Sequence, residues 1–232
     1  MTILIISDLH GNLEALEALP RNFDHLWVLG DLVNYGPNPA EVIQFVREHA
    51  SAVVRGNHDH AIAFNEDPRC SERFRQMADE TSRFTRSVLG EQDLNYLRNL
   101  PLKIGFEESG IRVLMCHATP GHPLFEYRTP ESPLWFRDQA EPSSSVLLVG
   151  HTHLPFQLTS AGRSVVNPGS VGQAKHGRPE ACYAKWEDSR ITLHTVPYDF
   201  ESTVRKLGSM PQSPAVYRDL SQVLRTGSAP VA

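Results

Sequence analysis

Cysteine and long hydrophobic runs are the features of which this sequence has least. It carries three cysteines, Cys70, Cys116 and Cys182, and none of them forms a C-x-x-C pair. Thiols this few and odd in number exclude a disulfide framework and a structural zinc site of the cysteine type, and they fit a reducing compartment. The N-terminal apolar run, residues 2–6, is too short to span a bilayer and lacks signal-peptide features. We therefore predict a cytoplasmic protein without a membrane segment.

Positive charge is also scarce. The 232 residues include 22 Lys and Arg against 27 Asp and Glu, which gives a net charge of −5 and a pI near 6.1. This balance, without a basic stripe, argues against a nucleic-acid partner. No internal repeat or low-complexity linker interrupts the chain, so we predict one domain over residues 1–232 with a C-terminal helical segment at about 199–232. Whether the domain forms a homo-oligomer is left open.

In the first hundred residues, short apolar runs alternate with helical patterns. Buried strands are predicted at 2–7, 26–29 and 52–54. One helix follows Asn12, which can cap it, and another follows Asn38-Pro39, a cap with proline at the first helical position. A long polar helix is expected from about residue 71, with a second short helix near 94–97. This alternation predicts βαβ units and a parallel sheet.

From residue 103 onward the pattern is rich in strands. The runs 103–106 and 112–116 flank a Glu-Ser-Gly turn and predict a hairpin. Further strands are predicted at 146–149, 156–159, 164–166, 181–186 and 191–196, and helix returns after Asp199 with a break near 210–214. We predict an α/β fold of two packed sheets with helices outside and an active site at the carboxyl ends of the strands.

Five short motifs place metal-binding side chains directly after five of the apolar runs. A buried strand that ends in a carboxylate, an amide or an imidazole suits a metal site at the edge of a sheet. Nitrogen and oxygen ligands without thiolate suit Mn, Fe, Zn, Ni or Co. Seven ligands exceed the needs of one ion, but with Asp31 shared they make two sets of four, as two ions about 3.5–4 Å apart require. The candidate ligands are Asp8, His10, Asp31, Asn57, His117, His151 and His153.

The ordered motifs D-x-H, G-D, G-N-H-D, H and G-H-x-H resemble those of the calcineurin-like metallophosphoesterase superfamily, above all its compact bacterial and archaeal phosphodiesterases. The resemblance spans residues 3 to about 197. It implies a four-layer α/β/β/α sandwich of two mixed sheets. It also implies a centre of two divalent ions, manganese in vitro, where a metal-bound hydroxide attacks the phosphorus of a small phosphorylated substrate.

The resemblance further implies a role for each motif residue. His58 matches the general acid that protonates the leaving oxygen. The ligands of one ion would be Asp8, His10, Asp31 and His153. The ligands of the other ion would be Asp31, Asn57, His117 and His151.

The motif after Asp31 departs from the protein-phosphatase branch of the family. That branch has D-x-x-D-R-G, whereas this chain has Asp31-Leu32-Val33-Asn34-Tyr35-Gly36. Asn34 can still form a hydrogen bond to the catalytic imidazole, but it adds no charge to stabilise the protonated ring. Tyr35 cannot replace an arginine that grips phosphate with two hydrogen bonds. A phosphoprotein substrate is therefore disfavoured relative to a small phosphodiester.

Other residues are candidates for the surroundings of the site. The run 167–173 matches a segment common in the phosphodiesterase branch and would bend a loop back over the site, although a plain tight turn is an equal interpretation. Residues 118–122 form a Gly/Pro loop that we expect to line the substrate pocket. The candidate substrate-binding or supporting residues are Asn34, Tyr35, Asp59, Asn167, Ser170, Lys175 and Arg178, of which the last two could meet the substrate phosphate.

The sequence therefore predicts a dinuclear metal-dependent phosphoesterase for small phosphodiesters or phosphomonoesters. Two alternatives within enzymes are a nucleotide or dinucleotide polyphosphate hydrolase and a phosphoprotein phosphatase. A third alternative is a non-catalytic scaffold, because a retromer subunit shares the fold of this family. The presence of every candidate ligand together with His58 argues against the scaffold.

Overall fold

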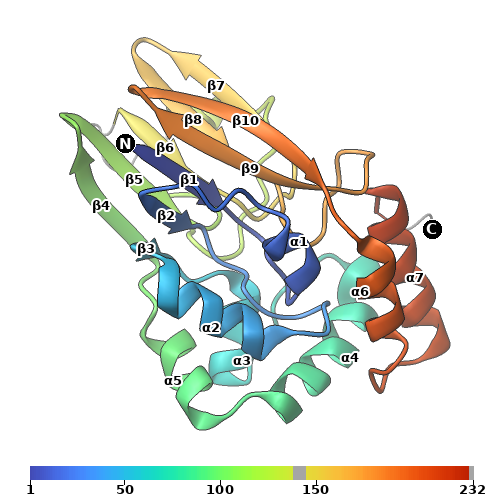
Figure 1. Ribbon diagram of the computed structural model, residues 1–232. Coiled ribbons are helices and arrows are strands. Elements are labelled where there is room, and N and C mark those ends of the chain that lie inside the picture. The colour runs from blue at the N-terminus through green and yellow to red at the C-terminus, as the bar shows by residue number, and fades with distance from the viewer. Residues whose placement is uncertain (138–144, 230–232) are drawn as a thin grey trace.

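The computed structural model describes residues 1–137 and 145–229, and this part of the chain forms two five-stranded sheets (Figure 1). The first sheet has the order β10 (Arg190–Pro197), β9 (Glu180–Glu187), β1 (Thr2–Ile6), β2 (His25–Val28) and β3 (Ala52–Val53). The second has the order β4 (Lys103–Glu108), β5 (Ile111–Cys116), β6 (Val146–Leu148), β8 (Arg163–Asn167) and β7 (Phe156–Ser160).

Both sheets are mixed. In the first, β1, β2 and β3 are parallel, while β9 and β10 are antiparallel to their neighbours. In the second, β5, β6 and β8 are parallel, and β4 and β7 run antiparallel at the two edges. The predicted hairpin at 103–116 is the β4–β5 pair. The predicted α/β sandwich of two mixed sheets is confirmed.

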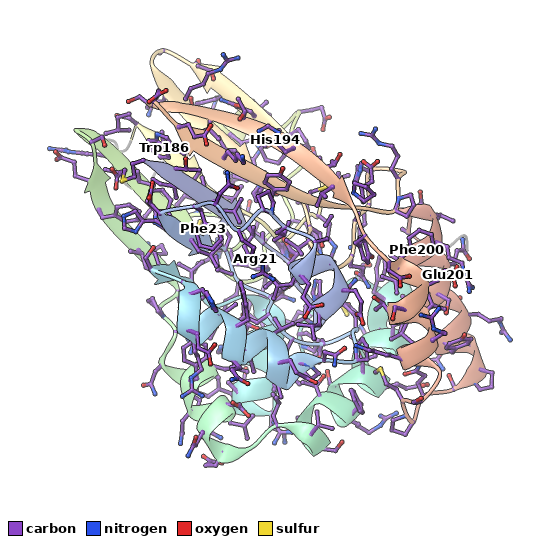
Figure 2. The ribbon with its side chains drawn as sticks, viewed as in Figure 1. Arg21, Phe23, Trp186, His194, Phe200 and Glu201 are labelled. Atoms are coloured by element: carbon purple, nitrogen blue, oxygen red, sulfur yellow. The ribbon has the colours of Figure 1, made fainter. Side chains whose placement is uncertain are left out.

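The pleat of β1 explains its unbroken apolar sequence. Ile3 and Ile5 face the core between the two sheets, and Leu4 and Ile6 face the core beneath the helices. A strand buried on both faces needs apolar side chains at every position. Between the sheets, the Trp27 ring packs edge-on against the rings of Phe106 and Trp186, with centroids 4.8 and 5.6 Å away, respectively. Figure 2 labels Trp186.

The helices α1 (Leu13–Glu17) and α2 (Pro39–His49) cover the first sheet. Asn12 caps α1 as predicted, because its side chain accepts a hydrogen bond from the Ala15 amide. Asn38 occupies the cap position of α2, but its side chain makes no capping bond and donates to the Glu41 carboxylate instead. The proline at the first position of α2, and not a side-chain cap, is therefore the sequence feature that favours the start of this helix.

The segment 57–100 contains three helices, α3 (Asn57–Phe64), α4 (Glu72–Val88) and α5 (Glu91–Asn99). No helix was predicted at the G-N-H-D motif, but Asn57 is the first residue of α3. Gly56 is the cap residue, and the Asp59 carboxylate accepts a hydrogen bond from its amide at 3.0 Å. Asp59, the third residue of the helix, therefore stabilises the start of α3. An acidic residue at this position is a feature that can be read from the sequence.

The C-terminal segment forms α6 (Phe200–Leu207) and α7 (Pro214–Thr226), which lie side by side (Figure 1). Glu201, labelled in Figure 2, pairs with Arg225 across the two helices at 2.8 Å. Their apolar faces pack with Tyr35 and with Met77 of α4. The helical segment predicted for about 199–232 ends at Thr226 in the described residues, and 230–232 lie outside them. None of the described helices has the length and apolar character needed to cross a membrane.

Candidate metal centre

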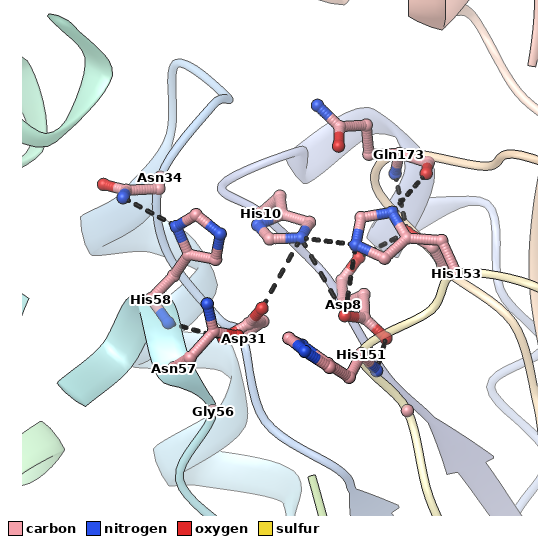
Figure 3. Close-up of polar contacts among 12 residues, drawn as sticks. Asp8, His10, Asp31, Asn34, Gly56, Asn57, His58, His151, His153 and Gln173 are labelled. Atoms are coloured by element: carbon pink, nitrogen blue, oxygen red, sulfur yellow. Dashed lines mark hydrogen bonds and ion pairs between the residues drawn. The ribbon is translucent and has the colours of Figure 1, made fainter. Parts of the chain in front are cut away.

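The carboxyl ends of five strands carry the candidate ligands, and the structure gathers six of them into two buried groups. The first group, Asp8, His10 and His153, comes from the loops after β1 and β6. His153 Nε2 lies 3.3 Å from Asp8 Oδ1 and 3.1 Å from His10 Nε2 (Figure 3). His153 is 143 residues from His10 in the sequence, so only the sheet edge brings it to Asp8 and His10.

The second group consists of Asp31, His117 and His151. His117 Nε2 lies 3.2 Å from Asp31 Oδ2 and 3.1 Å from the amide oxygen of Asn57. The Asn57 amide nitrogen donates to the Pro68 carbonyl, so its oxygen is the atom directed at the centre. Asp31 Oδ2 is also 3.8 Å from His10 Nε2 of the first group, which places this one oxygen between both groups.

Three of the four imidazoles in these groups are oriented by backbone carbonyls. Nδ1 of His10, His117 and His153 lies 3.1, 2.7 and 2.7 Å from the carbonyls of Val33, Leu29 and Gln173, respectively. A proton on Nδ1 that is donated to the carbonyl leaves Nε2 with its lone pair directed at the centre. This outer-shell arrangement is the usual one for histidine ligands in proteins.

The backbone at the site adopts a conformation that side chains disfavour. Several residues other than glycine have positive φ in the left-handed region, which costs on the order of 1–3 kcal/mol each and persists only where the surrounding structure enforces it. Such residues cluster at functional sites. Those at this centre are Asp8, His10, Asp31, Asn34, Tyr35, His151 and His153, with φ between 47° and 71°. His151 and His153 lie in a loop beyond β6, as the position of their motif after an apolar run predicted.

The buried polar atoms of the centre fit two cations. Among the described side chains, Asp8 Oδ1 and His151 Nε2 are buried without a hydrogen-bond partner. Such orphaned atoms are costly unless an ion or another group satisfies them. Burial raises the pKa of Asp8 to about 7, so its carboxylate needs compensating positive charge. Burial lowers the pKa of His10 to about 3, which keeps that ring in the neutral form that binds metals. The donor set of nitrogen and oxygen atoms suits divalent ions.

Asp31 and His117 form the most strongly polarised pair. Burial by itself opposes the charged form of His117, but the Asp31 carboxylate outweighs it and raises the pKa of His117 to about 9. The same histidine, followed by His58, holds the pKa of Asp31 well below its usual range against the effect of burial. Asp31 is therefore the carboxylate of the centre that stays ionised most readily.

His58 lies beside the two groups rather than in either of them. Its Nδ1 is 2.9 Å from the amide nitrogen of Asn34, which also donates to Ser82 Oγ (Figure 3 shows the first contact). With the amide nitrogen as donor, the single proton of the neutral ring resides on Nε2. The Tyr35 ring packs against both His58 and His10, with centroids 4.8 and 4.9 Å away, and holds the two imidazoles in place.

Three other predicted residues support the loops of the centre. The Asp59 carboxylate accepts hydrogen bonds from the amides of Asp31 and Leu32, both at 2.8 Å. Ser170 Oγ donates to the Asp8 carbonyl at 2.7 Å. Asn167 donates to the Gly150 carbonyl, also at 2.7 Å, and so supports the loop that carries His151 and His153. These side chains act on backbone positions.

Lys175 and Arg178, the two residues predicted to meet the substrate phosphate, differ in their position relative to the centre. The Lys175 ammonium lies 4.5 Å from the centroid of the Phe74 ring. Burial lowers the pKa of His153, and the charge of Lys175 lowers it further, so this ammonium acts on the first group. Arg178 is exposed and pairs with Glu180 at 3.6 Å. The structure thus brings Lys175, but not Arg178, toward the centre.

Tyr127 is a neighbour of the centre that sequence reasoning missed. Its ring stacks on His151 with centroids 3.9 Å apart and a tilt of 32°. The residue is 50% exposed, so one side of it is open to solvent. Burial and then the Asp31 carboxylate raise the pKa of Tyr127, which keeps its hydroxyl protonated. A tyrosine five residues beyond the end of the predicted pocket loop 118–122 could have been found only by extending that loop.

Gly56 and Gly150 allow the loops to approach one another closely. A Cβ at Gly56 would overlap the Asp31 carboxylate and its amide, and a Cβ at Gly150 would overlap Ser7 Oγ. Neither position can carry a larger residue without moving a candidate ligand or its neighbour. The glycines of the G-N-H-D and G-H-x-H motifs are therefore required by the packing of the site.

Two packed sheets whose strand ends bring together two buried His/Asp groups are the features of a metallophosphoesterase. Residues 1–189 match the model of the calcineurin-like phosphoesterase superfamily domain, and the chain belongs to this superfamily.

The chain is also similar to proteins of known sequence or structure. The chain is 31% identical over 228 residues to the uncharacterized protein MJ0912 of Methanocaldococcus jannaschii, with 88% of this chain and 91% of the relative covered. A metallophosphoesterase from Sphaerobacter thermophilus is similar in structure, with a TM-score of 0.81, 32% identity and coverage of 96% and 99% of the two chains. The symmetrical bis(5'-nucleosyl)-tetraphosphatase of Vibrio vulnificus is 32% identical over 127 residues, which cover 51% of this chain and 44% of the relative.

Proposed function

We propose that this protein is a dinuclear metal-dependent phosphoesterase that hydrolyses small phosphodiesters or phosphomonoesters. The observation that carries the proposal is the pair of buried His/Asp groups with Asp31 Oδ2 between them. Asp8, His10, Asp31 and His153 would hold one ion. Asp31, Asn57, His117 and His151 would hold the other. Two divalent ions in such a centre activate a water and neutralise charge on the phosphoryl oxygens.

The residues around the ions would position and protonate the substrate. His58 is held by Asn34, and in its protonated form the ring would donate a proton from Nε2 to the leaving oxygen and return to the neutral imidazole. Lys175 would add positive charge at the phosphate. The absence of an arginine at Tyr35 leaves the two ions and Lys175 as the main attraction for the phosphoryl group, which favours small esters over phosphoproteins.

The test compares substrates on protein loaded with Mn, Co or Ni. We expect a bis-aryl phosphodiester to be hydrolysed with a higher kcat/KM than a phosphoserine peptide, and a chelator to abolish both activities. A higher kcat/KM for the peptide would reverse the assignment of substrate class. A metal-replete sample that turns over no phosphoester would instead favour the non-catalytic scaffold.

A dinucleotide polyphosphate hydrolase is the second candidate. The identity to the symmetrical bis(5'-nucleosyl)-tetraphosphatase favours it, although the shared region covers about half of this chain. Incubation with bis(5'-adenosyl) tetraphosphate and analysis of the nucleotide products tests it directly. Symmetrical cleavage to two nucleoside diphosphates at a kcat/KM above that for the aryl diester would make this candidate the preferred one.

A further inference from the structure

A surface pocket of about 570 Å³ is lined by none of the candidate metal ligands. It is formed by the segment 121–126, which follows His117, together with Arg69 and Leu102. Volumes of this size are typical of sites for small molecules. The Arg69 guanidinium lies over the Phe125 ring, 4.5 Å from its centroid, and so forms a flat polar and aromatic wall.

Two connections tie this pocket to the centre. The Asn57 amide donates to the carbonyl of Pro68, the residue directly before Arg69. On the other wall, Tyr127 follows the pocket segment and stacks on His151 while remaining half exposed. The chain segments that line the pocket are therefore continuous with Pro68 and Tyr127, which contact the candidate ligands Asn57 and His151.

The wall of the pocket is held in place before any ligand arrives. The Glu126 carboxylate accepts hydrogen bonds from Thr119 Oγ1 at 2.6 Å and from Arg128 at 2.7 Å. Arg128 in turn lies over the ring of Trp135. A wall fixed by such contacts loses little conformational freedom on binding, which favours recognition of a rigid ligand.

We propose that Tyr127 and the Arg69–Phe125 pocket form a subsite for the nucleobase of a nucleotide phosphoester. The proposal rests on the phosphoesterase function proposed above and names its substrate class. An exposed tyrosine ring next to the reacting phosphate offers a stacking surface for a flat heterocycle. The guanidinium of Arg69 and the imidazole of His122 supply polar groups that can form hydrogen bonds with the edge of a base. A phenyl ring has no polar edge and would not use these groups.

Binding of non-hydrolysable phosphonates separates this subsite from catalysis. The ligands are thymidine 5'-phosphonate, the same deoxyribose phosphonate without a base, and phenylphosphonate. Their Kd values are measured by calorimetry on Mn-loaded protein, and the metal content of every sample is determined. In the wild type we expect thymidine phosphonate to bind roughly 5- to 150-fold more tightly than the abasic compound, the range for stacking of one base on an aromatic ring.

Variants test whether the difference in Kd between the thymidine and abasic compounds comes from the Tyr127 ring. Tyr127→Ala should make the two Kd values nearly equal, whereas Tyr127→Phe should preserve their ratio because the ring remains. Arg69→Ala should reduce the ratio in part. Val88→Ala removes a side chain of similar exposure at the end of α4 and should leave the ratio unchanged.

Several results would overturn the subsite. These are equal wild-type affinities for the thymidine and abasic compounds, a ratio that survives in Tyr127→Ala, or phenylphosphonate binding as tightly as thymidine phosphonate. A loss of metal in Tyr127→Ala that weakens all three ligands equally would mean that Tyr127 only packs His151. Because binding is measured without turnover, an inactive protein that still shows the ratio would refute the proposed function and not the subsite.

Discussion

Replacing Asp31 with asparagine removes one negative charge from the carboxylate that lies between both candidate metal groups. Asp31 Oδ2 is 3.2 Å from His117 Nε2 and 3.8 Å from His10 Nε2, and its other oxygen accepts a hydrogen bond from the His58 amide. Asparagine is close in shape, can keep that bond, and tolerates the φ of 55° at this position better than most residues. The fold should therefore survive, and the change isolates the charge.

The expected loss follows from the charge and the distance. Two unit charges about 4 Å apart interact by about 4 kcal/mol at an effective dielectric constant near 20, and 1.4 kcal/mol corresponds to a tenfold change in affinity. We therefore expect the affinity for each divalent ion to fall at least about 100-fold. His10→Ala is the control, because it removes a neutral ring from one group only.

Elemental analysis after dialysis against a weak chelator measures the outcome. Asp31→Asn should retain well under one ion per chain, and His10→Ala should retain the ion of the second group. Circular dichroism establishes that both variants are folded. Equal metal content in the two folded variants would show that Asp31 does not serve both ions, and the proposed division of ligands would have to be abandoned.

Three further predictions concern the same centre. His58→Ala should keep both ions and lose roughly 10²- to 10⁴-fold in kcat on a diester with a poor alkoxide leaving group, but much less on a p-nitrophenyl ester, and an even loss on both would remove His58 from the acid role. Gly56→Ala should destabilise the protein by about 1–3 kcal/mol and release metal, because its Cβ would overlap Asp31, and an unchanged Tm and metal content would contradict this. Chelation should lower the Tm of the wild type, since bound ions offset the buried Asp8 carboxylate, and identical Tm values with and without metal would argue against a buried metal centre.

Much of the fold could be predicted because the periodic signals are local. The apolar run at residues 2–6 predicts a strand buried on both faces, and the pleat of β1 satisfies that pattern with Ile5 on one side and Leu4 on the other. The helix α3 was missed because polar residues, Asn57, His58 and Asp59, make up its start and give no apolar periodicity there. Asp59 starts that helix by bonding the Gly56 amide, and at the same time it holds the backbone of the neighbouring Asp31 loop.

The motifs of the candidate site were visible in the sequence, but its surroundings were not. Each candidate ligand follows an apolar run, so its place at a strand end could be read without coordinates. Arg178 was one of two candidates to meet substrate phosphate, and the structure pairs it with Glu180 at the surface. Tyr127 was overlooked, because a lone aromatic residue in a loop has no local signature of stacking on His151.

The sequence by itself determined the chemistry of the site: nitrogen and oxygen donors without thiolate, placed after apolar strands in the order of a known superfamily. These properties depend on side-chain type and on short-range periodicity, and both can be read from a short segment of sequence without knowledge of the fold. The tertiary structure alone decided how close the donors lie, because Asp31 Oδ2 comes within 3.8 Å of His10 Nε2 and 3.2 Å of His117 Nε2 only after two sheets pack and their strand ends meet. It also decided which way each imidazole turns, since the carbonyls of Val33, Leu29 and Gln173 that orient those rings come from loops that meet only in the folded protein.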